Sequence, residues 1–493
     1  MTDRGWDRLT WALVLLAVIA GAVISLRVYQ AIPHLEDEFA NLWQAQVMAD
    51  GKLFTSSPPK PKATLIPFVV DYQGRRFGKY PPGWPALLSL GARADLIWLV
   101  NPLLGGLALW LTYQLAKRWL GGGLATLAAG LLLASPMFLI LTGTLMSHNL
   151  SLVLTLGVVL AWVDLFGGPV ESTHPRAATF VIGGGLGLLA LTRPLTAVGV
   201  ALPLVCHAAA LFLRKPRARK PLLELAALAA VLAALLPLWQ YALTGDPLLN
   251  LYTLWWPYDR LGFGPGHGVT EAGHSLGQAY FNTRFSLQAG LHDAFGWPYL
   301  SWLFIPLGIL PLAKRAGGWL ALALLPSLVL VYGAYWIGSW LFGPRYYYEA
   351  LPLLAVLSAA GIGWLAGWLP GVGRSRPAKL ATVALVAALM AVDLLLYIPT
   401  RVGGMKGLYG ISSAPVRSLR ASNLGHALIF VQSERWMGYA NLLPLAPPFS
   451  DSDLRIAWSI GLQADQQVAE QYPGYTVYYY RPEHPTALIR IRP

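Results

Sequence analysis

The chain has 493 residues, of which 56% are hydrophobic and only 12% are charged, and its formal net charge is +13. Soluble globular proteins carry about a quarter charged residues, so this composition excludes an ordinary soluble protein and indicates a membrane protein. The single cysteine, Cys206, excludes an intrachain disulfide.

Apolar segments of the length that crosses a bilayer, roughly 20 residues, recur along the chain. We predict spanning helices at residues 10–32, 95–116, 122–141, 147–167, 177–193, 195–213, 221–243, 298–313, 318–341, 347–369 and 380–398. No small-residue cleavage pattern follows the first segment, which is predicted to be a retained helix and not a removed signal peptide. The expected fold class is an all-α polytopic membrane protein with about eleven transmembrane helices.

The basic residues gather in alternate connections between these segments. One set of connections contains Arg4, Arg8, Lys117, Arg118, Arg176, Arg214, Lys215, Arg217, Arg219, Lys220, Lys314, Arg315, Arg374, Arg376 and Lys379. Because short cytoplasmic loops are enriched in Lys and Arg, this set is predicted to face the cytoplasm together with the amino terminus. We therefore expect a multi-pass protein of the cytoplasmic (inner) membrane. Its positive charge follows from this topology and from attraction to anionic membrane lipids, so no nucleic-acid partner is expected.

Three long regions are left on the predicted outer side. They are a loop at about 33–94, a loop at about 244–297 and a tail at 399–493. The tail is more polar than the rest of the chain. It contains candidate strands at 427–431, 475–480 and 487–491 and a candidate helix at 463–472. We predict two domains, a transmembrane domain at 1–398 and a small extracytoplasmic C-terminal α/β domain at 399–493.

Three acids, Glu36, Asp37 and Glu38, follow the first apolar segment. They begin a predicted helix, residues 36–50, whose apolar side is formed by Phe39, Leu42, Trp43, Val47 and Met48. The helix dipole alone favours acids at a helix start, which is one explanation of the cluster and the one we adopt for Glu36. The other explanation is functional. The apolar side would hold the helix along the membrane surface, where a carboxylate can take a proton from an acceptor that arrives from water.

A basic element lies later in loop 33–94. Lys79 begins the run Lys79-Tyr80-Pro81-Pro82-Gly83, whose two prolines would hold it on a stiff turn. An ammonium held beside a bilayer suits a lipid phosphate, and snorkelling towards lipid headgroups explains it equally well.

Two arginines occupy predicted outer turns. Arg345 begins a predicted span and could clamp phosphate oxygens with its planar guanidinium, or pair with Glu349 four residues later. Arg193, directly before Pro194, is a similar candidate.

Taken in order, four elements resemble the GT-C superfamily of membrane glycosyltransferases. They are the acidic pair Asp37-Glu38, the Tyr-Pro-Pro-Gly element at 80–83, a Met-Ser-His-Asn turn at 146–149 and a Gly-Pro-Arg-Tyr-Tyr helix start at 343–347. Within the superfamily, the chain resembles the group of protein O-mannosyltransferases (dolichyl-phosphate-mannose dependent) and lipid A aminoarabinose transferases. The likeness covers about residues 10–400.

The resemblance implies a glycosyltransferase that uses a polyprenyl-phosphate sugar donor. The glycosyl group would move, usually with inversion, to a protein, lipid or glycan acceptor at the outer face of the membrane. By this analogy Asp37 would be the base and Glu38 its neighbour in the acidic pair. The residues that would bind the donor's phosphate are Lys79, Arg345, Arg193 and Tyr347.

Loop 244–297 contains an aromatic and glycine-rich stretch that resembles a mobile lid. The candidate lid or acceptor-binding residues are Trp255, Tyr258, Arg260 and His267, together with His148 from an outer turn. Such aromatics also seat loops on membranes, so both explanations stay open. Some members of the resembled group use a divalent metal ion, which is the candidate cofactor here. Its ligands would be Asp37, Glu38 and His267, although no compact ligand spacing supports them.

A transporter or flippase of a lipid-linked saccharide is the alternative function. It would share the apolar bulk and the outer basic residues, but it would more naturally place charges at mid-membrane and contain internal repeats. The two hypotheses differ in whether Asp37, Lys79 and Arg345 converge on one cavity.

Overall fold

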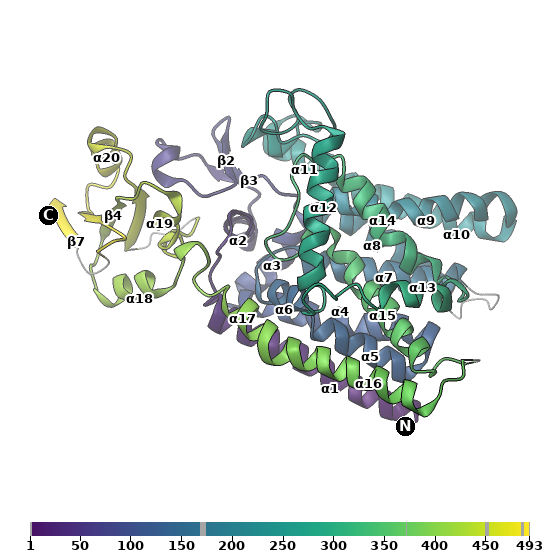
Figure 1. Cartoon of the computed structure of the whole chain (residues 1–493). Helices are drawn as coiled ribbons and strands as arrows, with labels where there is room; N and C mark the ends of the chain where they lie inside the picture. The colour runs from purple at the N-terminus through teal and green to yellow at the C-terminus, as the bar shows by residue number, and fades with distance from the viewer. Residues whose placement is uncertain (1, 168–173, 371, 449–452, 485–487, 493) are drawn as a thin grey trace.

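The computed structural model describes residues 2–167, 174–370, 372–448, 453–484 and 488–492. Most of the chain forms a bundle of long helices, and its last part forms a small mixed domain at one end of the bundle (Figure 1). The first helix of loop 33–94, α2 (Glu36–Ala49), and the strands of this loop lie between the bundle and the mixed domain.

Within the described residues, eight helical stretches are long and apolar enough to cross a membrane. They are Asp3–Val28 (containing α1, Asp3–Val23), α4 (Ile97–Leu120), α7 (His148–Phe166), α8 (Pro175–Thr192), α9 (Pro194–Arg214), Pro216–Thr244 (α10, Pro216–Ala233, and α11, Leu235–Thr244), Arg345–Leu365 (containing α15, Leu351–Leu365) and Arg376–Gly410 (α16, Arg376–Val392, and α17, Ile398–Gly403). These helices make the chain a multi-pass membrane protein.

A ninth candidate span is bent. Its two helices, α5 (Gly122–Leu133) and α6 (Pro136–Gly143), meet at 61°. Pro136 has no backbone N–H to continue α5 and instead begins a new helix. Ser135 caps that helix, because its hydroxyl accepts a hydrogen bond from the N–H of Phe138 at 3.3 Å.

Two of the predicted spans are shorter helices. The segment 298–313 forms α13 (Ile305–Ala313), and the segment 318–341 forms α14 (Trp319–Tyr332). Residues before α13 form turns, and Tyr299 among them has a φ of 64°, which a helix does not accommodate. Because the residues of these turns are apolar, a hydropathy pattern does not distinguish them from the helix that follows. The prediction of about eleven spanning helices is therefore corrected to eight or nine among the described residues.

Helices α13 and α15 pack backbone to backbone at two glycines. A Cβ at Gly308 would lie 2.0 Å from the carbonyl oxygen of Leu357, and a Cβ at Gly361 would lie 2.1 Å from that of Phe304. Small residues allow this close approach between helices in a membrane. The contact fixes α15, which continues directly from the turn that carries Arg345.

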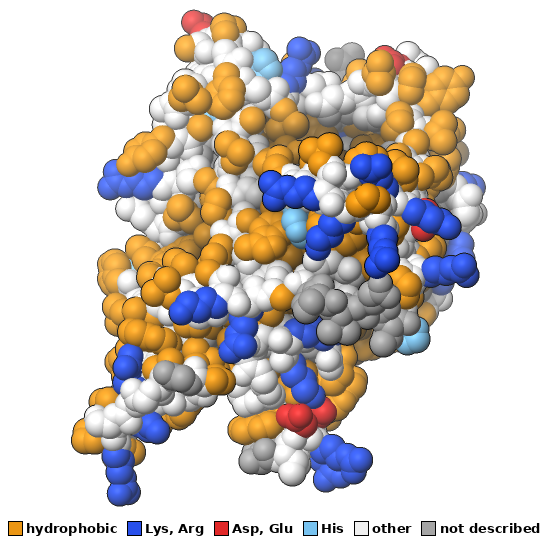
Figure 2. Space-filling model, turned by 90° about the vertical axis from the view of Figure 1, so that its right-hand side faces the viewer, with side chains coloured by type: hydrophobic (Ala, Val, Ile, Leu, Met, Phe, Trp, Pro, Cys, Tyr) orange, Lys and Arg blue, Asp and Glu red, His pale blue; other side chains and the backbone are white. Residues whose placement is uncertain are grey.

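The turn between α9 and α10 belongs to the end of the bundle that faces the viewer in Figure 2. Its basic residues are all exposed: Arg214, Lys215, Arg217, Arg219 and Lys220. Figure 2 shows many Lys and Arg side chains and few acidic ones on this end. That this end faces the cytoplasm stays a prediction.

Loop 33–94 folds into α2 (Glu36–Ala49), a small antiparallel sheet and α3 (Gly83–Arg93). The strands are β1 (Thr55–Ser56), β2 (Val69–Tyr72) and β3 (Arg75–Gly78), in the order β1-β3-β2. The predicted helix at 36–50 is confirmed. Because β3 ends at Gly78, the sheet positions Lys79, whose N–H donates to the carbonyl oxygen of Phe68 at 3.0 Å.

Loop 244–297 begins with turns and a short helical turn, Leu251–Leu254, and ends in α12 (Leu276–Asp293). Helix α12 mixes polar and apolar residues and contains no long apolar run, so it was not among the helices predicted from the sequence.

The C-terminal part contains a mixed sheet in the order β5-β4-β6-β7. Its elements are α18 (Ala414–Ala421), β4 (Ala427–Val431), α19 (Trp436–Ala440), β5 (Leu454–Trp458), α20 (Leu462–Ala469), β6 (Thr476–Tyr480) and β7 (Leu488–Arg492). Strand β4 pairs in parallel with β5 and β6, and β7 is antiparallel to β6.

The three predicted strands and the predicted helix of the tail are confirmed, except that residue 487 lies outside the described residues. Strand β5 was not predicted, because its apolar run is interrupted by Arg455. The helical stretch Arg376–Gly410 continues past the predicted domain boundary at 398.

The core of the C-terminal domain continues into loop 33–94. Phe39 and Trp43 of α2 are buried in one apolar cluster with Ile429 and Val431 of β4. The Phe39 ring also packs edge-on against Trp436, with ring centroids 6.1 Å apart. The C-terminal domain therefore holds the helix that carries the three acids.

Candidate active site

One cavity of about 550 Å³ lies where the two long loops meet the helix bundle. Its walls come from the first turn of α2, the residues after β3, the start of α7, the break between α8 and α9, loop 244–297 and the turn before α15. Among the described residues, the charged side chains that line it are Glu36, Asp37, Lys79, Arg193, Asp259 and Arg345. Asp37, Lys79 and Arg345 thus converge on one cavity.

The first turn of α2 presents Glu36 and Asp37 to the cavity, but Glu38 is not part of the lining. Successive side chains on an α-helix point about 100° apart, so three consecutive acids cannot share one face. Glu36 therefore takes the place beside Asp37 that the acidic-pair interpretation gives to Glu38.

Glu38 has a structural position. It is 1% exposed, and its carboxylate accepts hydrogen bonds from the backbone N–H groups of His34 at 2.9 Å, Leu35 at 3.1 Å and Leu145 at 2.6 Å. Burial raises the pKa of Glu38 to about 7, although these three hydrogen bonds favour the charged form. Glu38 closes the amino end of α2 and ties it to the segment before α7.

Asp37 is oriented by two partners. The Tyr80 hydroxyl donates a hydrogen bond to Oδ1, and Nη1 of Arg345 lies 3.4 Å from Oδ2. The Asp37 side chain is 21% exposed and so keeps an open side towards the cavity. Tyr80 is placed by the rigid Pro81-Pro82 turn that follows it.

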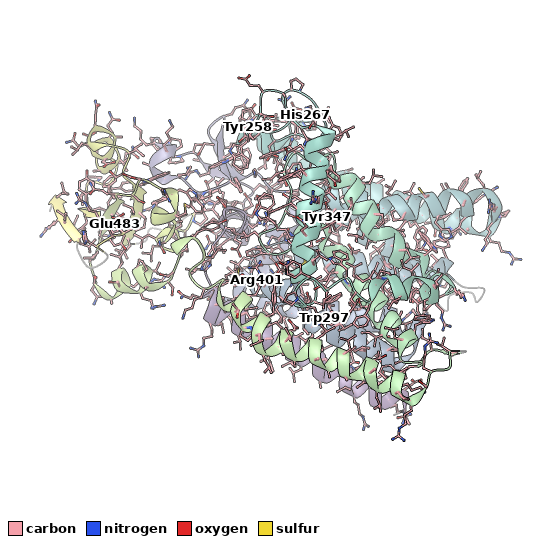
Figure 3. The ribbon with its side chains drawn as sticks, in the orientation of Figure 1. Tyr258, His267, Trp297, Tyr347, Arg401 and Glu483 are labelled. Carbon is pink, nitrogen blue, oxygen red and sulfur yellow. The ribbon has the colours of Figure 1, made fainter. Side chains whose placement is uncertain are left out.

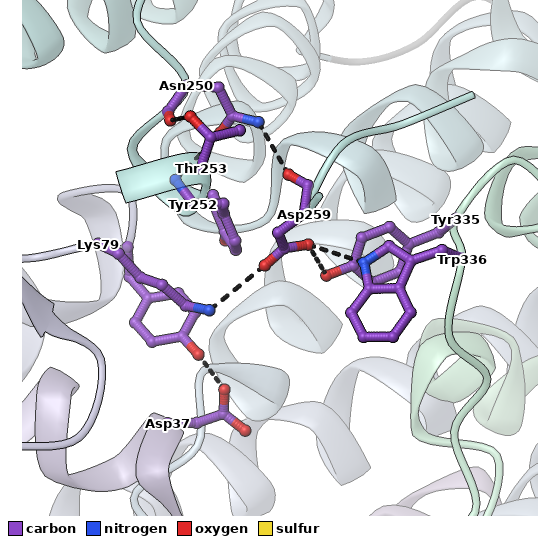
Figure 4. A network of polar contacts seen from close by, with 9 residues as sticks. Asp37, Lys79, Asn250, Tyr252, Thr253, Asp259, Tyr335 and Trp336 are labelled. Atoms are coloured by element: carbon purple, nitrogen blue, oxygen red, sulfur yellow. Dashed lines mark hydrogen bonds and ion pairs between the residues drawn. The ribbon is translucent and has the colours of Figure 1, made fainter. Parts of the chain in front are cut away.

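Lys79 and Asp259 form a buried ion pair (Figure 4). Their side chains are 3% and 1% exposed, and Nζ lies 3.4 Å from Oδ2. The ammonium also lies over the ring of Phe68 at 3.6 Å, with Trp256 at 4.8 Å and Tyr252 at 5.1 Å. Burial lowers the pKa of Lys79, and the Asp259 carboxylate opposes that fall. The cation therefore sits among aromatic rings with one carboxylate as its counter-ion.

Arg193 lies at the break between α8 and α9, where Pro194 begins the second helix. Its Nη1 donates to Oε1 of Glu349 at 3.2 Å, and its Nη2 donates to the Tyr332 hydroxyl at 3.1 Å. Glu349 is fully buried and does not line the cavity, so it supports Arg193 from behind.

Each cation of the cavity has its own carboxylate. The pairs are Lys79–Asp259, Arg193–Glu349 and Arg345–Asp37. Arg345 and Glu349 do not pair with each other, because they lie on a 3-10 turn and not on an α-helix, where residues four apart would be neighbours. Among the described charged residues of the lining, Glu36 makes no ion pair.

Several predicted site residues do not line the cavity. They are Glu38, Tyr347, Trp255, Tyr258, Arg260 and His267. In Figure 3, Tyr258 and His267 lie together near the outermost loops and Tyr347 lies well away from them. The neighbours Trp256 and Tyr346 line the cavity instead, because adjacent residues of these turns point in different directions. His148 does line it, at the start of α7.

The candidate metal ligands are not assembled. The described part of the chain contains no group of three His, Cys, Asp or Glu residues that could hold a metal ion. Asp37 contacts Tyr80 and Arg345, Glu38 accepts backbone hydrogen bonds, and His267 lies outside the lining.

Sequence reasoning did not select four residues that prove central to the cavity: Glu36, Tyr80, Trp256 and Asp259. Tyr80 and Asp259 stand inside runs that the sequence does single out. Only the folded chain separates them from their neighbours, because the choice depends on which way each side chain points.

The same architecture occurs in solved structures of low sequence identity. ArnT from Cupriavidus metallidurans bound to undecaprenyl phosphate matches with a TM-score of 0.62 and 12% identity, over 97% of this chain and 93% of that chain. This chain has the GT-C fold. The archaeal oligosaccharyltransferase AglB from Archaeoglobus fulgidus, in complex with an inhibitory peptide and a dolichol-phosphate, matches with a TM-score of 0.53 and 11% identity, over 95% of this chain and 69% of that chain.

At these identities the likeness establishes the GT-C fold and not the activity. No protein-family model matches the sequence, and no curated protein sequence matches it either.

Proposed function

We propose that this GT-C protein transfers a glycosyl group from a polyprenyl-phosphate donor to a protein, lipid or glycan acceptor at the outer face of the cytoplasmic membrane. The observation that carries the proposal is the convergence of Asp37 with Lys79, Arg193 and Arg345 on one cavity. An acid and several cations in one place are what the reaction needs, because the transition state gains positive charge on the sugar and negative charge on the phosphate.

The bond changes can be written for a hydroxyl acceptor. The acceptor oxygen forms a bond to the anomeric carbon of the sugar, and the bond between that carbon and the phosphate oxygen breaks. The electron pair of the broken bond stays on the phosphate, and Asp37 takes the acceptor's proton. Attack opposite the leaving phosphate inverts the anomeric configuration.

The cations stabilise the departing phosphate. Arg345 and Arg193 present planar guanidinium groups that suit phosphate oxygens, and Lys79 adds a compact charge. Glu349 keeps Arg193 in position from behind, at 3.2 Å. When the phosphate engages Arg345, the long 3.4 Å contact with Asp37 weakens and the carboxylate becomes free to accept a proton.

Two bound ligands in the similar structures agree with this donor class. ArnT was solved with undecaprenyl phosphate, and AglB was solved with a dolichol-phosphate and a peptide. Undecaprenyl and dolichyl carriers are both polyprenyl-type lipids.

The proposal includes the orientation of the chain. The basic turns face the cytoplasm, and the cavity and the C-terminal domain face outwards.

The test is to incubate the purified protein in nanodiscs with a panel of undecaprenyl- and dolichyl-phosphate sugars and a membrane extract as the acceptor source. We expect one donor to lose its sugar and to leave the free prenyl phosphate, as measured by mass spectrometry. If every donor stays intact, while the protein in sealed vesicles moves a donor between leaflets, the flippase alternative replaces this proposal.

A further inference from the structure

Lys79 and its carboxylate partner Asp259 are both cavity residues. Arg345 and its partner Asp37 also both line the cavity, whereas Glu349 stands behind Arg193 and outside the lining. A phosphate can approach Arg193 without displacing its partner, whereas Asp259 itself lines the cavity beside Lys79.

The contact between Lys79 and Asp259 is loose. Its length of 3.4 Å exceeds the roughly 2.7–2.9 Å that is usual for a charge-assisted hydrogen bond. The remaining N–H groups of the ammonium face aromatic rings, of which Phe68 is the nearest at 3.6 Å. The oxygens of a phosphate can accept hydrogen bonds from these N–H groups, which the faces of aromatic rings do only weakly.

Asp259 also has partners that do not depend on Lys79. The Tyr335 hydroxyl donates to its Oδ1 at 2.8 Å, and Nε1 of Trp336 donates to the same oxygen at 3.0 Å (Figure 4). The side-chain amide of Asn250 donates to the Asp259 carbonyl oxygen at 3.1 Å. Asp259 would therefore keep its hydrogen bonds after Lys79 turned away, and a buried carboxylate with retained donors avoids most of the cost of losing an ion pair.

We propose that Asp259 is the resident counter-ion of Lys79, and that the phosphate of a polyprenyl-phosphate donor displaces it. The inference rests on the proposed function and assigns Asp259 a positioning role that sets donor affinity. Before a donor binds, the carboxylate keeps the buried ammonium paired. When the donor binds, the phosphate takes over this pairing, and Asp259 stays with Tyr335 and Trp336. One negative charge faces Lys79 before and after the exchange.

The test is the affinity of the full-length protein for undecaprenyl phosphate in phosphatidylcholine nanodiscs, measured by native mass spectrometry. Asp259→Asn removes the competing charge and keeps the side-chain oxygen that accepts from Tyr335 and Trp336. We expect its Kd to fall roughly tenfold, because the buried ammonium then lacks a counter-ion until phosphate arrives.

The matched control is Asp246→Asn, which makes the same change in net charge. Asp246 lies on the same loop but is exposed and outside the lining. The Kd of this control should not change.

A second variant covers the case in which Asp259→Asn does not fold. Tyr335→Phe removes one of the two hydrogen bonds that Asp259 keeps when Lys79 turns away, so displacement of Asp259 costs more and undecaprenyl phosphate should bind more weakly, with a change smaller than roughly tenfold. Phosphatidylglycerol and inorganic phosphate serve as separate probes, and the wild type should bind both more weakly than undecaprenyl phosphate.

The outcomes separate the two claims. If the wild type binds undecaprenyl phosphate no better than phosphatidylglycerol, the proposed function fails and the inference fails with it. If the wild type binds it selectively, but folded Asp259→Asn binds it equally well or more weakly than the wild type, or folded Tyr335→Phe binds it equally well or more tightly, the counter-ion role of Asp259 alone is overturned. Equal tightening by Asp246→Asn would also overturn it, because net charge would then explain the effect.

Discussion

At the scale of single residues, the cavity is a set of charges that are already paired. Lys79, Arg193 and Arg345 each face one carboxylate, and Glu36 is the lining acid without an ion pair among the described residues. Isolated charges near a membrane are costly, so pairing lets the site hold several of them before any ligand arrives. In the proposed exchange, a donor phosphate takes the place of Asp259 at Lys79.

Glu38 gives a pH prediction at this scale. Its pKa is raised to about 7 from 4.5, so its protonated form favours the folded state. That contribution is complete below about pH 4.5 and is lost as the pH rises through about 7, and it amounts to at most roughly 3 kcal/mol. We expect the thermal unfolding temperature of the wild type in detergent to fall more between roughly pH 5.5 and roughly pH 8.5, on either side of this pKa, than that of Glu38→Gln.

The variant Glu38→Gln does not titrate, although it loses part of the hydrogen bonding and should be less stable overall. Equal pH dependence in both proteins would show that Glu38 is ionised throughout this range.

At the scale of elements, α2 joins the site to the C-terminal domain. Its acids face the cavity or cap its amino end, and its apolar side shares a core with β4. Because the same helix serves both, the C-terminal domain takes part in holding Asp37 in place.

Trp43→Ala tests this coupling. Trp43 is 5% exposed within the shared core, and replacing a buried Trp by Ala costs roughly 3–5 kcal/mol. We expect a lower unfolding temperature, and faster protease cleavage of the C-terminal domain. Leu462→Ala in α20 is the control, because Leu462 is 71% exposed and should change stability little. Normal protease resistance of Trp43→Ala would show that the domain is held without α2.

The sequence predicts a helix or strand where a continuous run of neighbouring residues carries the signal. Apolar runs identify the long helices, and the short runs at 427–431 and 475–480 identify strands β4 and β6. The bend at Pro136 and the shortness of α13 depend on turns that hydropathy does not register. The ion pairs could not be predicted, because Lys79 and Asp259 are 180 residues apart and meet only through the fold.

At the scale of the whole molecule, the GT-C fold places two long loops over one end of a helix bundle and builds the cavity between them. A reaction that joins a lipid-borne donor to an acceptor from water requires a site at the membrane boundary. The proposed orientation puts this boundary on the outer face.

Cysteine labelling tests the orientation. In a Cys206→Ala background, Arg217→Cys lies in the exposed basic turn after α9, and Glu434→Cys lies exposed in the C-terminal domain. We expect a membrane-impermeant maleimide, added to intact spheroplasts, to label the second variant and not the first. The opposite result would place the cavity on the cytoplasmic side.

The central claim is that Asp37 acts on the acceptor in glycosyl transfer. The most direct measurement is donor turnover by Asp37→Asn, with undecaprenyl phosphate binding followed on the same preparation. Removal of a general base lowers the rate by roughly 10²–10⁴-fold. We expect a loss of this size at saturating donor, with the folded protein still binding undecaprenyl phosphate. Turnover at the wild-type rate would contradict it.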